Sequence, residues 1–515
     1  MNGAESLIRT MTAAGVDVCF ANPGTTEMHL VQALDSVGGV RAVLGLFEGV
    51  CSGAADGYAR MTGRPAMTLL HLGPGMANGL ANLHNAHRAR TPVFSVVGDH
   101  ATWHRGRDAP LETDIESFAR PVSKWVHTST SAQDVAGDTA RAIGAARSAP
   151  GGVATLIVPA DCAWGDAEGP ARPIPGAPAA AVLDDAVEAA ARALSGERPA
   201  ALLLGATALT EVGLRAAGRI AAATGCHLYA ETLPARVERG GGLPTPQRLP
   251  YFPEEATAAL AQASRLVVAG AVEPVAFFGC PGLPSELAPP GMPVETLADP
   301  AHDAADALER LADRLGAGAG ADPVPGPPAP SGPPDGPLTP TTLSQVIAAG
   351  QPEGAIVVDE GLTVSAFYVA ASGGAARHTY MALTGGAIGQ GPPSATGAAI
   401  ACPDRPVINL QADGSGMYTA QALWTQARER LDVTTLVCSN RVYGILLEEL
   451  ARAGVQRPGP QSTGTTSLGD PALDWVALAT GMGVPASRAT TTQELARELD
   501  RALAEPGPHV VEMML

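Results

Sequence analysis

The sequence predicts an α/β protein built from three doubly wound domains, each with a parallel sheet. The chain has 515 residues, which at roughly 150 residues per domain suggests about three hydrophobic cores. Two stretches rich in proline and glycine, at residues 165–178 and 316–340, divide the chain. In each resulting segment, short apolar runs alternate with alanine-rich stretches of helical period. We therefore expect domains at residues 1–165, 180–315 and 338–515.

The apolar runs are the predicted strands of these sheets. They lie at residues 16–20, 66–72, 93–97 and 153–158 in the first domain, at 200–204, 266–270 and 293–297 in the second, and at 355–358, 407–410, 434–438 and 510–513 in the third. Continuous apolar runs are typical of parallel strands that helices cover on both faces. Such sheets bind ligands at the carboxyl ends of their strands, so we expect the functional residues in the loops that follow these runs.

Composition narrows the range of partners. The formal charge is −18, from 51 acidic and 33 basic side chains, and no run of Lys or Arg offsets it, so nucleic acid is not an expected partner. No stretch approaches the roughly 18 apolar residues that a membrane-spanning helix needs. The N-terminus also lacks a basic segment followed by an apolar core. We therefore expect a cytoplasmic protein that binds no membrane.

The first candidate site combines Asp413 and Asn440. Asp413 directly follows one predicted strand, and Asn440 follows the next strand along the chain. The carboxyl ends of neighbouring parallel strands meet at one edge of a sheet, so both side-chain oxygens can reach one hard cation such as Mg²⁺. Gly414 and Ser415 lie at a helix start, where backbone N–H groups can bind a diphosphate. The alternative is an ordinary Asp-Gly turn with an asparagine capping a strand end.

Three side chains of the first domain form a second group of candidates. Glu48 follows an apolar run and precedes a helix, and a carboxyl group in apolar surroundings can share a proton with a nitrogen base. His71 lies at a strand end, where an imidazole can orient or protonate a reacting group. Thr25 lies in the turn that follows the first strand. The alternatives are a helix-start glutamate, a structural histidine and a simple N-cap.

The segment at residues 413–444 resembles the thiamine diphosphate motif of acetolactate synthases and benzoylformate decarboxylases. It contains DG at 413–414, ALWT at 422–425 and SNRVYG at 439–444. The resemblance implies that Asp413 and Asn440 supply side-chain ligands to Mg²⁺ and that Val442 supplies its backbone carbonyl. It also implies that the cofactor is bound by Gly414, Ser415, Tyr443 and Gly444. Ala412 and Ser439 depart from the usual pattern, but neither departure removes a metal ligand.

The same resemblance gives roles to residues of the first two domains. Glu48 takes the place of the glutamate that hydrogen-bonds the cofactor's aminopyrimidine. His71 and Thr25 match an active-site histidine and a substrate-facing hydroxyl of benzoylformate decarboxylases. Phe277 stands where those decarboxylases have a second active-site histidine, and a phenylalanine transfers no proton.

In the third domain, the resemblance assigns part of the cofactor pocket to the run TGGAIGQG at residues 384–391. Ile388 takes the place of the bulky apolar side chain that supports the bent cofactor. Gly386 and Glu360 are expected to line the same pocket. An ordinary glycine turn and a strand-end turn are the alternative explanations.

The resemblance implies a pyrimidine-binding, a central and a diphosphate-binding domain, in that order. It implies an enzyme that uses thiamine diphosphate and Mg²⁺ to decarboxylate a small 2-keto acid or to ligate the product to a second carbonyl compound. It further implies a homodimer or homotetramer in which Glu48 acts across a subunit interface. Acetolactate synthases bind FAD in the central domain, but the glycine cluster at 239–242 follows no predicted strand, so FAD is possible but unsupported. A true acetolactate synthase with FAD is one alternative, and a non-catalytic cofactor-binding paralogue is the other, because of Ala412, Ser439 and Phe277.

Overall fold

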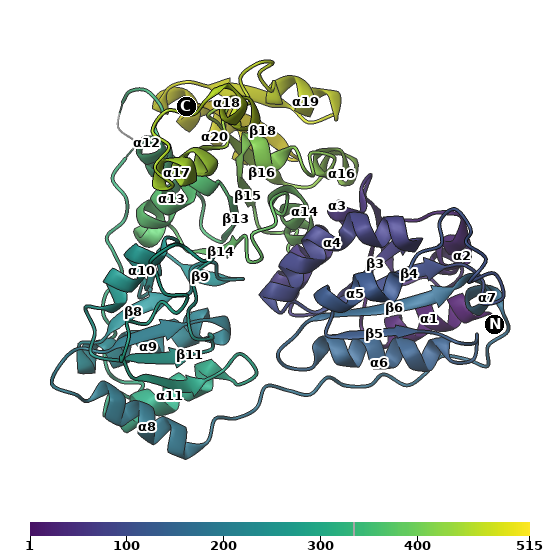
Figure 1. Cartoon of the computed structure of the whole chain (residues 1–515), viewed down its shortest axis with the longest axis horizontal. Helices are drawn as coiled ribbons and strands as arrows, with labels where there is room; N and C mark the ends of the chain where they lie inside the picture. Colours follow the sequence, from purple (N-terminus) through teal and green to yellow (C-terminus); the bar gives the residue numbers. More distant parts are fainter. Residues whose placement is uncertain (333–334) are drawn as a thin grey trace.

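The protein folds into three lobes that follow one another along the chain (Figure 1). The computed structural model describes residues 1–332 and 335–515, so residues 333–334 of the predicted 316–340 linker lie outside the described part. Within the described residues, the three sheets have six, five and seven strands. The predicted class, α/β with parallel sheets in three domains, is confirmed. No helix of this part of the chain is both long and apolar enough to cross a membrane.

The N-terminal sheet has the strand order β2-β1-β3-β4-β6-β5, and its neighbouring strands are parallel. Its strands are β1 (Val18–Asn22), β2 (Arg41–Leu44), β3 (Ala66–His71), β4 (Val93–Asp99), β5 (Trp125–Thr128) and β6 (Val153–Pro159). Its helices are α1 (Gly3–Ala13), α2 (Met28–Val37), α3 (Glu48–Thr62), α4 (Leu72–Ala89), α5 (Ile115–Ala119), α6 (Val135–Arg147) and α7 (Ala160–Trp164), with short 3-10 turns η1 (Thr25–Glu27) and η2 (Arg120–Val122). The inner strands β4 and β6 are buried along their whole length, whereas the edge strands β2 and β5 are partly exposed. The apolar runs therefore revealed the middle of the sheet and not its edges.

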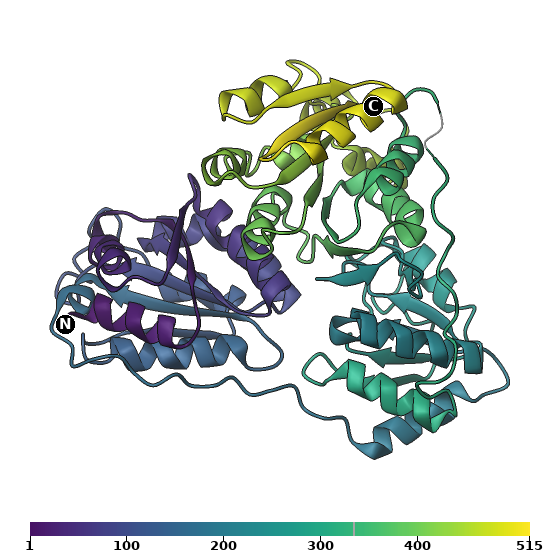
Figure 2. The same cartoon turned by 180° about the vertical axis from the view of Figure 1, so that it is seen from behind.

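The central sheet has the order β10-β8-β7-β11-β12 and is also parallel. Its strands are β7 (Ala201–Leu204), β8 (His227–Ala230), β10 (Gln247–Arg248), β11 (Leu266–Ala269) and β12 (Val294–Ala298). The helices of this lobe are α8 (Asp184–Leu194), α9 (Glu211–Thr224), α10 (Pro253–Leu260) and α11 (Ala304–Arg314), with the 3-10 turn η3 (Ala206–Leu209). The long segment at residues 165–183 reaches this lobe from the N-terminal one along an extended path (Figures 1 and 2).

The C-terminal sheet has the order β17-β18-β16-β15-β13-β14-β9. Its strands are β13 (Ala355–Glu360), β14 (His378–Ala382), β15 (Val407–Ala412), β16 (Val433–Ser439), β17 (Ala486–Ala489), β18 (His509–Met514) and β9 (Val237–Arg239). Its helices are α12 (Pro340–Gly350), α13 (Ser365–Ala371), α14 (Gly391–Ala401), α15 (Asp413–Gly416), α16 (Ala422–Glu429), α17 (Gly444–Arg452), α18 (Pro460–Thr466), α19 (Trp475–Gly481) and α20 (Thr492–Ala504), with turns η4 (Leu362–Val364) and η5 (Ser372–Gly374). The strand β9 comes from the central segment of the sequence and pairs antiparallel with β14, so the central segment contributes a strand to the C-terminal sheet.

The N-terminal and C-terminal lobes meet where α3 packs against α14 (Figure 1). Glycines on both helices allow this close approach. A Cβ atom on Gly57 would lie 2.1 Å from the carbonyl oxygen of Ser394, and one on Gly397 would lie 1.9 Å from that of Ala54. Because no larger residue fits at either position, the two helices touch backbone to backbone. This contact fixes the N-terminal lobe against the loop that precedes α14.

Candidate active site

The carboxyl ends of β15 and β16 carry the first group of predicted site residues. These strands are parallel neighbours, so Asp413 and Asn440 lie at the same edge of the sheet. Both line a cavity of about 20 Å³, a volume that holds a single ion or water. The same cavity is lined by the predicted residues Gly414, Ser415, Val442, Tyr443 and Gly444. Its whole lining comes from the C-terminal lobe, without Glu48 or His71.

The carboxyl group of Asp413 has the surroundings of a cation ligand. It is 2% exposed and accepts hydrogen bonds from the backbone N–H groups of Gly414, at 2.8 Å, and Arg441, at 2.7 Å. Burial raises the pKa of Asp413, and these N–H groups act in the opposite direction. Within the described residues, no cluster of three His, Cys, Asp or Glu side chains is suited to hold a metal. A metal here would therefore take mixed carboxylate, amide and carbonyl oxygens, a donor set that fits Mg²⁺ shared with a phosphate ligand.

Arg441 separates the two predicted ligands Asn440 and Val442 and was not singled out by the sequence. Its φ of +58° is a left-handed conformation that costs a non-glycine residue free energy. Its N–H group donates to Asp413, and the N–H group of Val442 donates to Oδ1 of Asn440 at 3.0 Å. The strained turn thus ties the end of β16 back to the end of β15.

The loop at residues 384–391 carries the predicted cofactor-facing residues Gly386 and Ile388. Gly386 is exposed and has a φ of +73°, and Ile388 is half-buried. Glu360 lies behind this loop, where its carboxylate accepts hydrogen bonds from the N–H groups of Gly389 and Gly391, both at 2.5 Å. Glu360 is 1% exposed. It therefore supports the loop from within the protein, and its direct contact with a cofactor stays a prediction.

Glu360 makes the stability of the protein depend on pH. Burial raises its pKa from 4.5 to about 7, so the fold favours its protonated form. Its contribution to stability is therefore complete below the unfolded pKa and is lost as the pH rises through about 7. We expect the melting temperature to fall between about pH 5 and pH 8, and to fall less in Glu360→Gln, as measured by calorimetry. The exposed control Glu168→Gln should keep the wild-type slope, and an equal slope in the Glu360 variant would contradict this account.

Glu48 is the first residue of α3 and is 9% exposed. Nδ2 of Asn78, on α4, donates to its Oε2 at 2.9 Å. A Cβ atom on Gly75 would lie 3.2 Å from Oε1 of Glu48. Because residue 75 is a glycine, no side chain at this position blocks access to Oε1. The carboxyl group is thus held in one orientation at the N-terminus of α3.

His71 is paired with a buried glutamate that the sequence analysis missed. Its Nδ1 lies 2.7 Å from Oε2 of Glu27, which is fully buried. A carboxylate accepts hydrogen bonds, so Nδ1 carries the proton and Nε2 is left for another partner. Two glycines make room for the pair: a Cβ atom on Gly24 would lie 2.4 Å from the imidazole ring, and one on Gly98 would lie 1.7 Å from Oε1 of Glu27. The arrangement fixes the tautomer and the direction of the imidazole.

The neighbouring hydroxyl groups of Thr25 and Thr26 have different surroundings. Thr25 is exposed, so its side chain is open to a small molecule. Thr26 donates to Oε1 of Glu27 at 2.5 Å and lies 3.3 Å from Nδ1 of His71. The hydroxyl that completes the His71 pair is therefore that of Thr26. The role of Thr25 toward a substrate stays a prediction.

Phe277 of the central lobe lies against the loop at residues 384–391. Its Cε1 atom is 3.2 Å from the position of a Cβ atom on Gly386, and its ring packs 4.9 Å from that of Tyr251. The side chain remains 40% exposed. The central lobe therefore places an apolar side chain, and no second histidine, beside the predicted cofactor loop.

A second cavity, of about 450 Å³, lies between the N-terminal and central lobes, with Arg88, Arg90 and Glu231 in its lining. Burial raises the pKa of Glu231 to about 7, although Arg90 acts in the opposite direction.

The glycine cluster at 239–242 follows the strand β9, so the expectation that no strand precedes it was wrong. However, β9 belongs to the C-terminal sheet and is followed by β10 and not by a helix. The cluster is therefore not a dinucleotide fingerprint.

Comparisons with known proteins agree with these features. Residues 1–118 match the N-terminal TPP binding domain of thiamine pyrophosphate enzymes, and residues 363–513 match the C-terminal TPP binding domain. The chain is 52% identical to a Mycobacterium tuberculosis protein named, provisionally, as an acetolactate synthase large subunit, over 100% of this chain and 99% of that protein. It is 32% identical to benzoylformate decarboxylase of Pseudomonas aeruginosa, over 97% of this chain and 96% of that enzyme.

Solved structures give the same result. The thiamine diphosphate-dependent 4-hydroxybenzoylformate decarboxylase of Rhodococcus jostii superposes with a TM-score of 0.87 at 25% identity, over 99% of this chain and 98% of that one. The match thus covers all three lobes, and with them the residues around Glu48 and those around Asp413. The chain belongs to the family of thiamine diphosphate-dependent enzymes acting on 2-keto acids, which includes acetolactate synthases and benzoylformate decarboxylases.

Proposed function

We propose that the protein is a Mg²⁺-dependent 2-keto acid decarboxylase and carboligase. Its site has two half-sites, the residues around Asp413 in the C-terminal lobe and those around Glu48 in the N-terminal lobe, which meet in a homodimer. The observation that carries the proposal is the convergence of Asp413, Asn440 and Val442 around a cavity of ion size. A buried carboxyl group beside amide and carbonyl oxygens fits Mg²⁺ and the diphosphate of the cofactor. When bound, thiamine diphosphate supplies a nucleophilic carbon and an electron sink for the departing carboxylate.

In the proposed reaction, Glu48 and His71 of the N-terminal lobe transfer protons. Glu48, held by Asn78, would hydrogen-bond the pyrimidine ring of the cofactor and exchange a proton with it at its carboxyl oxygen. His71, held by Glu27, presents Nε2 to the reacting group and orients or protonates it. A group such as His71 that delivers a proton would direct the cofactor's chemistry to decarboxylation, whereas a second carbonyl compound in place of the proton would direct it to ligation. The His71–Glu27 pair favours the decarboxylase outcome.

The exposed apolar side chains around both half-sites support a homodimer. In the C-terminal lobe, Tyr418 is 54% exposed and Leu446 is 46% exposed, close to the ends of β15 and β16. In the N-terminal lobe, Leu46 is 48% exposed and lies two residues before Glu48. We propose that a second copy of the chain covers these side chains. In that dimer, Glu48 of one subunit serves the cofactor of the other, and the same interface is compatible with a tetramer.

The test is incubation with thiamine diphosphate, Mg²⁺ and a panel of aliphatic and aromatic 2-keto acids, with carbon dioxide and ligation products followed by NMR. We expect carbon dioxide from at least one acid, and none from Asp413→Ala, because that variant lacks a metal ligand. Asp404→Ala, at the exposed turn before β15, is the matched control and should keep wild-type turnover.

The other outcomes identify the alternatives. Acetolactate from pyruvate together with flavin absorbance in the purified protein would point to a true acetolactate synthase. Cofactor binding in calorimetry without consumption of any keto acid would reject the proposal and point to a non-catalytic paralogue.

A further inference from the structure

We infer that the N-terminal lobe of each chain positions the cofactor-facing loop, residues 384–391, of the same chain, with Asn85 as the principal positioning residue. The inference rests on the proposed function, in which Gly386 and Ile388 face the cofactor. It concerns a contact within one chain, and it adds a structural task to a lobe whose proposed catalytic residues serve the partner subunit.

The loop is tied to the N-terminal lobe at every second residue. Nε2 of His84 lies 3.1 Å from the carbonyl oxygen of Gly385, and Nδ2 of Asn82 donates to that of Gly389 at 3.2 Å. Between them, Ala387 is bound through both its N–H and its carbonyl group. The residues in between are the exposed Gly386 and the half-buried Ile388. The bonded residues thus hold the loop from one side, and between them lie the two residues that are proposed to face the cofactor.

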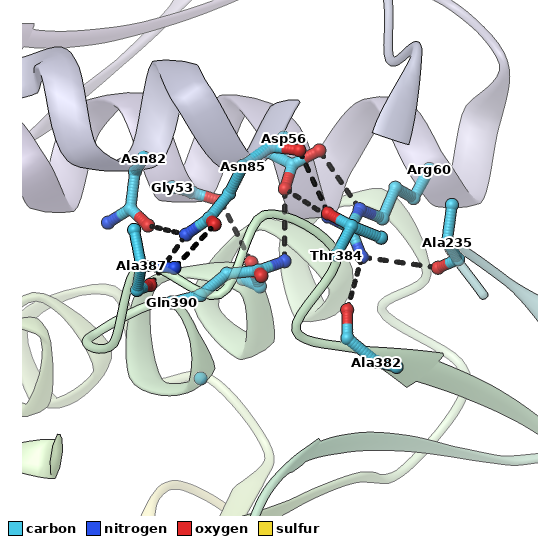
Figure 3. Close-up of polar contacts among 12 residues, drawn as sticks. Gly53, Asp56, Arg60, Asn82, Asn85, Ala235, Ala382, Thr384, Ala387 and Gln390 are labelled. Carbon is cyan, nitrogen blue, oxygen red and sulfur yellow. Dashed lines mark hydrogen bonds and ion pairs between the residues drawn. The ribbon is translucent and has the colours of Figure 1, made fainter. Parts of the chain in front are cut away.

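Asn85 makes the central contact of this series (Figure 3). It is fully buried, its Nδ2 donates to the carbonyl oxygen of Ala387 at 2.8 Å, and its Oδ1 accepts from the N–H group of Ala387 at 3.2 Å. A side-chain amide is the one group that matches a backbone N–H and C=O at once. Nδ2 also donates to Oδ1 of Asn82 at 2.9 Å, which fixes the orientation of the amide. A Cβ atom on Gly385 would lie 2.5 Å from Oδ1 of Asn85, so the loop lies directly on this side chain.

Both ends of the loop are anchored by α3 (Figure 3). Nη2 of Arg60 donates to Oγ1 of Thr384 at 2.8 Å, at the start of the loop. Nε2 of Gln390 donates to Oδ2 of Asp56 at 3.1 Å, near its end. With its ends fixed, the loop can change shape only in the middle, where Asn85 binds. The direction of the Gly386 carbonyl and of the Ile388 side chain therefore depends on this amide.

Loss of the Asn85 contact should affect binding of the thiamine rings and not binding of the diphosphate. Gly386 and Ile388 are proposed to contact the thiamine rings, whereas Asp413 and Asn440, on other strands, are proposed to bind Mg²⁺ and the diphosphate. Loss of the Asn85 contact should weaken binding of thiamine diphosphate and leave binding of a bare diphosphate unchanged. General damage to the fold would weaken both.

The experiment compares wild type, Asn85→Asp and Ser394→Ala by titration calorimetry in Mg²⁺, with thiamine diphosphate and with inorganic pyrophosphate as probes. Asn85→Asp keeps the shape of the side chain and the acceptor for the Ala387 N–H group, but turns the donor into an acceptor that faces a carbonyl oxygen. We expect roughly tenfold weaker binding of thiamine diphosphate and unchanged binding of pyrophosphate. Ser394→Ala removes another bond across the same interface, to Gly53, and should change neither.

Equal affinity of Asn85→Asp and wild type for thiamine diphosphate would overturn the inference, and so would a parallel loss of both probes. Should Asn85→Asp fail to fold, His84→Ala, at a half-buried position, gives the same selectivity test with a loss of about threefold. Wild-type protein that binds pyrophosphate but not thiamine diphosphate would instead overturn the proposed function, and the inference with it.

Discussion

Replacement of Glu48 by glutamine is expected to lower kcat for carbon dioxide release by roughly 10³-fold while the fold is kept, because the amide cannot exchange the proton. The glutamine oxygen still accepts the hydrogen bond from Asn78, so the local packing is preserved. The measurement is turnover at saturating thiamine diphosphate, Mg²⁺ and keto acid. Glu255→Gln, an exposed glutamate in the first turn of α10, is the matched control and should keep full activity.

The same variant tests whether two chains share one site. Mixed subunits of Glu48→Gln and Asp413→Ala form heterodimers in which one of the two sites has both an intact Glu48 and an intact Asp413. Random exchange should therefore restore about a quarter of the wild-type activity, although each variant alone is inactive. Unchanged turnover of Glu48→Gln would refute its proton-transfer role, and failure of the mixture to recover would refute the shared site.

Removal of the Asp56 carboxylate should destabilise the protein by about 3–5 kcal/mol, because it leaves the Arg60 guanidinium buried without its counter-charge. Their side chains are 0% and 1% exposed, and the pair is bidentate, with Nε to Oδ1 at 2.9 Å and Nη2 to Oδ2 at 2.7 Å. Arg60 also donates to the carbonyl oxygens of Ala382 and Ala235, so the pair joins all three lobes (Figure 3). Chemical denaturation of Asp56→Ala, followed by circular dichroism, measures the effect on the first unfolding transition.

The control for this prediction is the pair of Arg120 and Glu116, which has the same i, i+4 spacing but side-chain exposures of 66% and 35%. Arg120→Ala should cost no more than about 0.5 kcal/mol, since exposed pairs of this kind contribute little. A loss in Asp56→Ala no larger than in Arg120→Ala would show that the buried pair does not hold the lobes together.

The sequence predicted most of the inner strands and the edge strand β12, and it missed the inner strands β8 and β14 together with the other edge strands. Runs such as 93–97 and 153–158 are apolar because helices cover both of their faces. The edge strands β2, β5 and β17 are partly exposed and carry mixed side chains, so no continuous run marks them. The strand β14 is buried, but its sequence HTYMA is half polar. The strand β9 joins the C-terminal sheet by pairing with the distant strand β14, and no local pattern reveals such a pairing.

The residues of the candidate site were also predicted only in part. Asp413 and Asn440 were brought together from the sequence because each follows a strand and adjacent parallel strands end at one edge. Glu27, Asn85 and Arg60 were missed because their partners lie 44, 302 and 322 residues away, and spacing in the sequence does not indicate such contacts. The placement of side chains at strand ends was therefore predictable, whereas the residues that hold them in place were not.

The helix α3 gives the proposed dimer a means of communication between its two catalytic centres. Glu48 stands at its N-terminus and is proposed to serve the partner's cofactor, while Asp56 and Arg60, two and three turns further on, bind the ends of the loop that is proposed to contact the chain's own cofactor. Because these residues lie on one continuous helix of 15 residues, we expect a displacement at one end to reach the other. Cofactor loading or turnover at one centre should then alter the second, and the two centres would work as a coupled pair.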